Sequence, residues 1–303
     1  MLRQKILGIE FKNPFVLASG IMNSNEAVLL NSLKRGCAAV TTKSTNLKGK
    51  EGHPAPNFAP FEAGYINAVG LKNHGVKEEI ASVNRIKAET DAPIFFSIFG
   101  KEVSEFAAVA KEASKSEADF LEVNISCPNV QKEFGLPFAF DNGKVEEITR
   151  AVKRNSSKPV FVKLSPNVPR IVETAKAAQE GGADGLTAIN TVGPGLLLDL
   201  KTKKPRITNG VGGVSGAAIR PVAQRCVFDI FKEVDLPIIG LGGVETRNDV
   251  LEMMMVGATL VGIGSVTYKC GLTIFDKLSE EVETYLIQEK YKNVSDLIGL
   301  AHR

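Results

Sequence analysis

A thiol flanked by side-chain amides is the segment of this sequence best suited to chemistry. The run NISCPN, residues 124–129, places Cys127 directly after an apolar, β-rich stretch. A cysteine at a strand end is more often a small buried apolar residue than a catalyst. Core packing does not require the amides of Asn124 and Asn129 beside it, however. We therefore take Cys127 as the candidate catalytic residue.

Asparagines recur at the ends of predicted strands or in the loops that follow them. They are Asn67, Asn124, Asn129 and Asn190. An amide side chain offers both a donor and an acceptor, and the edge of a pyrimidine ring alternates C=O and N–H groups. A single loop asparagine usually caps a turn or a helix. Four of them at one face favour binding of a pyrimidine-like ring.

Two lysines close predicted strands, Lys43 in VTTKS and Lys163 in VFVKLSP. Lysine is almost never buried without a partner. At the rim of a site it can meet a carboxylate, or the negative charge of a reduced flavin. An equally favoured alternative is a lysine whose aliphatic stem lies along the rim and whose ammonium group reaches water.

Glycine-rich runs occupy residues 240–244 (GLGGV) and 262–265 (GIGS), at the ends of what we count as the seventh and eighth strands. The loops after these strands form the usual phosphate site of a (β/α)8 barrel, where backbone N–H groups bind the anion. No GxGxxG or Walker A pattern accompanies them. FMN therefore suits this site better than a dinucleotide.

Short apolar runs alternate with amphipathic segments along the chain, which predicts parallel βαβ units. Eight such units favour a closed (β/α)8 TIM barrel over an open sheet. The predicted strands are Phe15–Ala18, Ala38–Thr42, Ile94–Ile98, Phe120–Ile125, Val160–Leu164, Gly185–Ile189, Ile238–Leu241 and Leu260–Ile263. The predicted helices are Val103–Ser114, Val145–Arg154, Val168–Glu180, Ala217–Glu233 and Arg247–Val256. Residues 3–12 predict a short N-terminal hairpin that turns near Gly8 and could close the barrel bottom.

Three connections are too long for ordinary loops: Ser44–Gly75, Ser126–Lys144 and Asn190–Gly216. All three follow strands. In a barrel they therefore lie together at the C-terminal face, where the active sites of such barrels form.

The bulk composition excludes several classes of protein. A length of 303 residues fits one domain, 1–303, since α/β barrels run to about 250 residues. The net charge of +3 argues against nucleic acid, and we interpret the cluster Lys201, Lys203, Lys204 and Arg206 as a solvated loop. The four cysteines are widely spaced, which predicts no disulfide framework, no metal site and a reducing, cytoplasmic location. No signal peptide or membrane-spanning run is expected.

Taken together these segments resemble the class 1 dihydroorotate dehydrogenase family over nearly the whole chain. The resemblance rests on NPFVLASG (13–20), TTKS (41–44), NAVGLKN (67–73), NISCPN (124–129), VKLSP (162–166), Asn190-Thr191, GGVSG (212–216), GLGGV (240–244) and GIGS (262–265). The combination of NISCPN with NAVGLKN is highly specific.

The resemblance implies an FMN-binding barrel in which Cys127 is the general base. It would remove the C5 proton of dihydroorotate while C6 passes a hydride to flavin N5. The implied FMN contacts are Ser19, Lys43, Ser44, Ser97, Asn124, Lys163, Ile189, Gly216, Gly242, Gly243, Gly264 and Ser265. The implied substrate contacts are Lys43, Asn67, Ala68, Val69, Gly70, Leu71, Asn124, Asn129, Asn190 and Thr191. Ser97 departs from the family, which has asparagine there, so a direct flavin contact at this position is in doubt.

The stretch from Leu198 to Gly216 looks like the 1B type of this family. That resemblance implies a homodimer that passes electrons to NAD through a partner subunit carrying FAD and an iron–sulfur cluster, in a heterotetramer. Fumarate or another acceptor is the alternative.

Other functions remain open at this point. A related pyrimidine reductase, such as the FMN domain of dihydropyrimidine dehydrogenase, would prefer uracil. A tRNA-dihydrouridine synthase would need an RNA-binding surface, against which the modest charge argues. A flavin-binding assembly subunit without activity would not need Cys127 among amides.

Overall fold

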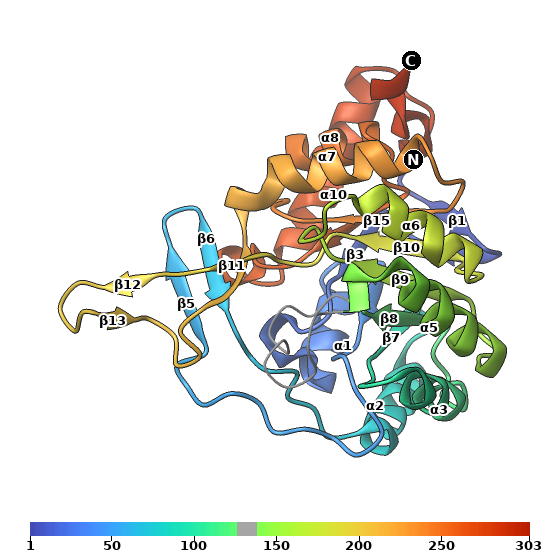
Figure 1. The fold of residues 1–303 in the computed structure, drawn as a ribbon. Coiled ribbons are helices and arrows are strands. Elements are labelled where there is room, and N and C mark those ends of the chain that lie inside the picture. The colour runs from blue at the N-terminus through green and yellow to red at the C-terminus, as the bar shows by residue number, and fades with distance from the viewer. Residues whose placement is uncertain (126–137) are drawn as a thin grey trace.

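Eight parallel strands close into a barrel in the computed structural model, which describes residues 1–125 and 138–303 (Figure 1). The strands are β3 (Phe15–Leu17), β4 (Ala39–Thr41), β7 (Ile94–Ile98), β8 (Phe120–Asn124), β9 (Val160–Leu164), β10 (Gly185–Ala188), β15 (Ile238–Leu241) and β16 (Leu260–Ile263). They pair in this order around the ring, and β10 closes it by pairing with both β9 and β15. The predicted barrel is confirmed, with every predicted strand end within one residue of the observed one.

Helices cover the outside of the barrel (Figure 1). They are α1 (Glu26–Lys34), α2 (Val76–Glu89), α3 (Val103–Ala113), α5 (Asn142–Asn155), α6 (Ile171–Glu180), α7 (Arg220–Phe231), α8 (Arg247–Met255), the short α9 (Thr267–Cys270) and α10 (Ile274–Gln288). Short 3₁₀ helices occur at η1 (Ile21–Ser24), η3 (Phe138–Phe140), η4 (Ala217–Ile219), η5 (Val294–Leu297) and η6 (Leu300–His302). The five predicted helices are α3, α5, α6, α7 and α8, and α1, α2, α9 and α10 are additional.

Local sequence explains where these helices begin. The predicted start of α7 at Ala217 is the turn η4, and α7 itself starts at Arg220 with a proline in its first turn. Proline is tolerated there because the first helical N–H groups have no intrahelical partner. Helix α8 begins with a capping box, in which the Thr246 side chain accepts from Asp249 N and Asp249 accepts from Thr246 N. This cap holds the end of the glycine-rich loop after β15.

The N-terminal hairpin closes the bottom of the barrel, as predicted. Strands β1 (Gln4–Ile6) and β2 (Ile9–Phe11) pair antiparallel, and Gly8 has a positive φ of 86° in the turn. Phe11 is 1% exposed, and its ring centroid lies 6.4 Å from that of Phe95 and 6.0 Å from that of Phe120. These aromatic side chains fill the end of the barrel opposite the predicted site.

Two of the long connections fold together above the barrel. Strands β5 (Phe58–Phe61) and β6 (Gly64–Asn67) come from the first, and β11 (Val192–Gly195) and β14 (Gly212–Ser215) come from the third. They form one four-stranded sheet in the order β11-β14-β6-β5. The second predicted long connection, Ser126–Lys144, lies largely outside the described residues.

A narrow arm extends from this sheet, away from the barrel (Figure 1). It carries β12 (Leu198–Asp199) and β13 (Lys204–Pro205), which pair antiparallel. Lys201, Lys203, Lys204 and Arg206 are exposed on it, which fits a solvated loop. Leu200 is also exposed, to 88%.

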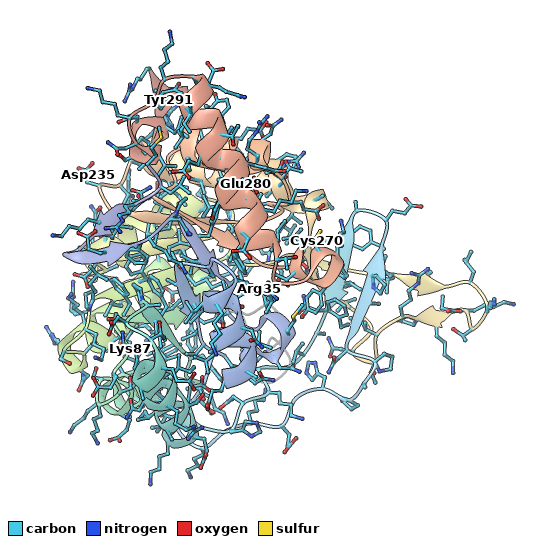
Figure 2. All side chains as sticks on the ribbon, turned by 180° about the vertical axis from the view of Figure 1, so that it is seen from behind. Arg35, Lys87, Asp235, Cys270, Glu280 and Tyr291 are labelled. Carbon is cyan, nitrogen blue, oxygen red and sulfur yellow. The ribbon has the colours of Figure 1, made fainter. Side chains whose placement is uncertain are left out.

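The outer surface is rich in charged side chains. Figure 2, seen from behind, labels the charged residues Arg35, Lys87, Asp235 and Glu280 across this face of the molecule. Lys87 pairs with Asp119 there, with its Nζ 3.1 Å from the carboxylate. None of the helices in the described ranges is long and apolar enough to span a bilayer.

Candidate active site

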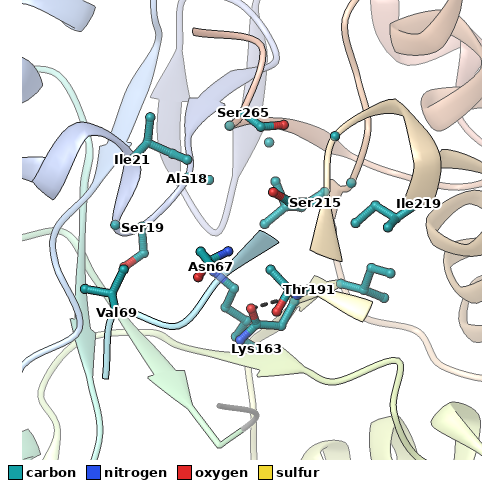
Figure 3. A pocket seen from close by; sticks show the side chains of 18 of the residues that line it. Ala18, Ser19, Ile21, Asn67, Val69, Lys163, Thr191, Ser215, Ile219 and Ser265 are labelled. Atoms are coloured by element: carbon teal, nitrogen blue, oxygen red, sulfur yellow. Dashed lines mark hydrogen bonds between the residues drawn. The ribbon is translucent and has the colours of Figure 1, made fainter. Parts of the chain in front are cut away.

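A pocket opens at the carboxyl ends of the barrel strands and gathers most of the predicted site residues (Figure 3). It encloses about 1220 Å³ of space between atoms, a volume that includes open solvent at its mouth. The predicted residues that line it are Ser19, Lys43, Ser44, Asn67, Val69, Gly70, Leu71, Asn124, Lys163, Ile189, Asn190, Thr191, Gly216, Gly242, Gly243, Gly264 and Ser265. They meet because the carboxyl ends of parallel strands share one face of the barrel.

Four predicted residues call for separate comment. Ala68 is fully buried beside the pocket, and its carbonyl lies 2.9 Å from Nδ1 of His53. Ser97 is fully buried in the barrel, one layer below the pocket lining. Cys127 and Asn129 lie outside the described residues.

A chain of hydroxyl and amide groups forms the floor of the pocket. The Ser44 hydroxyl accepts from Asn124 Nδ2 at 3.0 Å and lies 2.9 Å from the Ser97 hydroxyl. The Ser19 hydroxyl donates to the Thr42 carbonyl at 2.7 Å and lies 3.4 Å from Ser44 Oγ. These contacts hold the Asn124 amide in one orientation at the end of β8.

Both predicted strand-end lysines reach the pocket, and each has a carboxylate in its surroundings. Lys163 is 5% exposed, and its Nζ lies 3.8 Å from Oε1 of Glu122, which is 2% exposed. Lys43 Nζ lies close to Gly20, because a Cβ added at Gly20 would be 3.2 Å from it. Burial raises the pKa of Glu79 to about 7, although the positive charge of Lys43 acts to lower it. Because Lys163 is buried, the alternative in which the lysine head group reaches water at the rim is excluded for this residue.

Sequence reasoning missed Glu122 and Glu79. Glu122 stands in the middle of the apolar strand FLEVN, and an ionisable residue in a strand buried on both faces needs a partner. A glutamate inside an otherwise apolar strand was therefore the sequence signal from which Glu122 could have been found. Glu79 lies in the first turn of α2, where acidic residues are common, so its position gave no such sequence signal.

Glycines form a cradle on another side of the pocket. Gly243 has a φ of +73°, and a Cβ there would come within 2.8 Å of both the Gly216 carbonyl oxygen and Arg220 N. Gly242 likewise leaves no space for a side chain, with Ala223 Cβ 2.6 Å from the position of a Cβ. Gly216, Gly242 and Gly243 therefore line the pocket with bare backbone, a surface that a phosphate group can approach closely. Figure 3 draws Ser265, next to this cradle, on a different side of the pocket from Lys163.

An aromatic wall that the sequence did not predict completes the pocket. Phe58 and Tyr268 line it, with ring centroids 4.9 Å apart, and Tyr65 stacks on Phe58 at the same distance. The Tyr268 hydroxyl accepts a hydrogen bond from Met22 N at 2.9 Å. Such flat apolar surfaces suit a planar ring system. Isolated aromatic residues in a long connection and in the short helix α9 give no periodic pattern from which this wall could have been inferred.

The amide cluster is assembled by the sheet above the barrel. Asn67 at the end of β6 donates to the Gly213 carbonyl at 3.4 Å. Thr191 N donates to Asn190 Oδ1 at 2.8 Å, and the Thr191 carbonyl accepts from Asn167 Nδ2 at 3.0 Å. Figure 3 shows Asn67, Thr191 and Lys163 close to one another in the pocket.

None of the cysteines in the described ranges lines this pocket. Burial raises the pKa of the Cys37 thiol to about 12 and that of Cys226 to about 11, so both stay protonated at neutral pH. Cys270 is exposed on the surface (Figure 2). Within residues 1–125 and 138–303, no three His, Cys, Asp or Glu side chains gather into a group that could hold a metal ion.

The fold and the pocket define a class of protein: a (β/α)8 barrel with a glycine-lined, lysine-bearing polar pocket at the carboxyl ends of its strands. The family model for dihydroorotate dehydrogenase matches residues 1–286, and the chain belongs to this family. This confirms the predicted family, its flavin-dependent oxidoreductase chemistry and its place in pyrimidine biosynthesis.

Curated relatives match the chain end to end. A protein of Methanocaldococcus jannaschii is 41% identical over 100% of this chain and 98% of its own length. Proteins of Methanothermobacter thermautotrophicus and Pyrococcus horikoshii are 38% and 39% identical over at least 98% of each chain. All three are named dihydroorotate dehydrogenase B (NAD(+)), catalytic subunit.

Proposed function

We propose that residues 1–303 work as one domain that oxidises dihydroorotate to orotate with FMN as its flavin. The observation that carries this proposal is the combination, in one pocket, of a glycine cradle suited to one phosphate group with an amide and lysine cluster suited to a pyrimidine carboxylate. A binding site for one phosphate group fits FMN, which carries a single terminal phosphate.

The residues present fit FMN on two grounds. A Cβ at Gly242 would clash with Ala223, and one at Gly243 would clash with Arg220 and Gly216, so only glycine lets the loops of the cradle pack this closely. The donors Lys163 and Asn124 lie at the pocket floor, where they suit the polar edge of a flavin ring. The proposed FMN contacts are thus the predicted ones, with Ser97 acting through Ser44. Bound there, FMN would supply a hydride acceptor at N5.

The proposed substrate site uses the amides around Asn67, Asn124 and Asn190, with Asn129 as a further member. Lys43 is suited to the orotate carboxylate by charge, and Val69 to Leu71 give the site its shape. Cys127 is the proposed general base. Its thiolate would take the C5 proton as the C5–C6 bond becomes double. Two observations support this role: Cys127 closely follows the pocket residue Asn124 in the chain, and none of Cys37, Cys226 and Cys270 lines the pocket.

We place the chain in a larger assembly, a homodimer joined to an electron-transfer subunit carrying FAD and an iron–sulfur cluster, with NAD as the final acceptor. Support comes from the relatives' names, which specify NAD(+) and a catalytic subunit. The exposed Leu196, Leu198 and Leu200 on the arm offer apolar surface for protein contacts. The unpaired thiols Cys37, Cys226 and Cys270 suit a reducing cytoplasm.

The test begins with the purified chain. Its flavin is released and identified, and dihydroorotate oxidation is then followed with NAD, fumarate and an artificial dye as separate acceptors. We expect FMN and activity with the dye, and NAD reduction only when the partner subunit is added. Dihydrouracil is the matched control substrate. Turnover of dihydrouracil but not of dihydroorotate, or a protein that takes up no flavin, contradicts the proposal.

A further inference from the structure

Glu122 is a buried acid inside the barrel, directly below the pocket. It projects from the middle of β8 and is 2% exposed. Its Oε1 accepts from the Ser97 hydroxyl at 3.1 Å and its Oε2 from the Thr187 hydroxyl at 3.1 Å. Lys163 Nζ lies 3.8 Å from Oε1. Four neighbouring strands, β7 to β10, therefore each contribute one polar side chain to this cluster.

Packing alone does not account for a charge at this place. The layer just below consists of apolar side chains, among them Phe120 and Phe161, whose ring centroids lie 5.5 Å apart. Replacing a buried ion pair by apolar residues is often neutral or stabilising, because both ions lose their hydration. A carboxylate kept in this position therefore points to a role in the pocket above it.

Hydrogen bonds connect the carboxylate to the pocket in a defined direction. Ser97 donates to Glu122, so its oxygen is left to accept from the Ser44 hydroxyl 2.9 Å away. Ser44 in turn accepts from Asn124 Nδ2. The donors thus run from Asn124 through Ser44 and Ser97 to Glu122. The negative charge at the end of this chain sets the direction of every hydroxyl in it.

We propose that Glu122 is a positioning residue that compensates the charge of Lys163, and so limits how strongly the pocket stabilises negative charge on the flavin ring. Lys163 is one of the two lysines that line the pocket, with Lys43, and Glu122 is the carboxylate paired with it. With Glu122 neutral, the Lys163 charge acts on the pocket without opposition. In a water-poor interior, one added unit of positive charge favours an anionic ring considerably. This inference rests on the proposed flavin site.

The decisive variant is Glu122→Gln, which removes the charge and keeps the shape. Sulfite binds reversibly at flavin N5, bleaches the yellow absorbance and leaves the ring negatively charged, so its affinity reports the charge around the ring without turnover. We expect Glu122→Gln to bind sulfite about tenfold more tightly than the unchanged protein, with a more positive flavin midpoint potential. Glu122→Asp, which restores a carboxylate, is the matched control and should remain within about threefold of the unchanged protein.

Unchanged or weaker sulfite binding in Glu122→Gln with flavin bound overturns the inference. Equal shifts in Glu122→Gln and Glu122→Asp also overturn it, because a general disturbance of the floor would then be the cause. If Glu122→Gln does not fold, Thr187→Val decides: it removes one donor from the carboxylate, whose negative charge is then less offset, so weaker sulfite binding supports the inference while no shift refutes it. A protein that takes up no flavin at all contradicts the proposed function instead.

Discussion

Asn67 of β6 and Gly213 of β14 lie directly opposite each other, and the Asn67 amide donates to the Gly213 carbonyl at 3.4 Å. These residues belong to different long connections, which follow the second and the sixth barrel strands. Gly213 also lies against Thr191, since an added Cβ would be 2.1 Å from Thr191 Oγ1. Through Gly213, these contacts join Asn67 and Thr191, two residues of the proposed substrate site that come from different long connections.

We expect Gly213→Ala to weaken substrate binding while leaving flavin binding intact. The new methyl group must displace Thr191 or separate β14 from β6, and the cradle at Gly242 and Gly243 is on other loops. The expected result is a KM for dihydroorotate raised about tenfold or more, measured by steady-state kinetics beside flavin content. Gly210→Ala, in the same connection but with nothing within 4 Å, is the control. A normal KM in Gly213→Ala would show that this contact does not shape the site.

The glycine cradle gives a second expectation. Gly243→Ala places a methyl group within 2.8 Å of the Gly216 carbonyl and forces an unfavourable positive φ on alanine. We expect the Kd for FMN, measured by fluorescence titration of the apoprotein, to rise about tenfold or more. Gly271→Ala, at φ +67° in open space, carries the same backbone strain without the clash. Equal losses in both variants would assign the effect to strain alone.

The assignment of Cys127 is tested by two substitutions. Cys127→Ala should lower dihydroorotate oxidation by about 10²- to 10⁴-fold, the usual contribution of a general base, with the flavin still bound. Cys127→Ser should also be slow and shift the pH profile upward, because a hydroxyl is far harder to deprotonate than a thiol. Cys270→Ser, on the exposed surface, should turn over normally. Near-normal turnover in Cys127→Ala refutes the base assignment.

Glu79 predicts a pH dependence of stability. Burial raises its pKa in the folded state to about 7 from an ordinary value of 4.5, so between these values the folded state binds more protons than the unfolded one. The free energy of unfolding must then fall as the pH rises from about 4.5 to about 7, by at most about 3 kcal/mol. Glu79→Gln should remove this component, whereas the neighbouring exposed Glu78→Gln should keep it. Urea denaturation at several pH values measures the difference, and parallel profiles for Glu79→Gln and the unchanged protein contradict the expectation.

The barrel could be predicted because its evidence is local. Strands such as Ile94–Ile98 and Val160–Leu164 are short apolar runs bounded by turn residues, and they occur as predicted. Glycines at 242, 243 and 264 mark their loops by residue type, and strand order alone assigns those loops to one face. The site residues Lys43, Asn124 and Lys163 followed from their positions at strand ends, and Ser44 followed from the family resemblance. The binding roles of these residues, and the single domain, stay predictions.

The tertiary structure decided what lies inside the barrel and what lies above it. All five residues of β8 are buried, so no alternation of polar and apolar residues shows which side chains face inward. Only closure of the barrel brings Glu122 against Lys163, Ser97 and Thr187, and places Ser97 one layer below the pocket. Likewise, pairing of β6 with β14 joins segments 146 residues apart, and such long-range pairings leave no periodic signal in the chain. The sequence by itself therefore determined the scaffold and the kinds of residue at its mouth, while three-dimensional packing decided which of them touch.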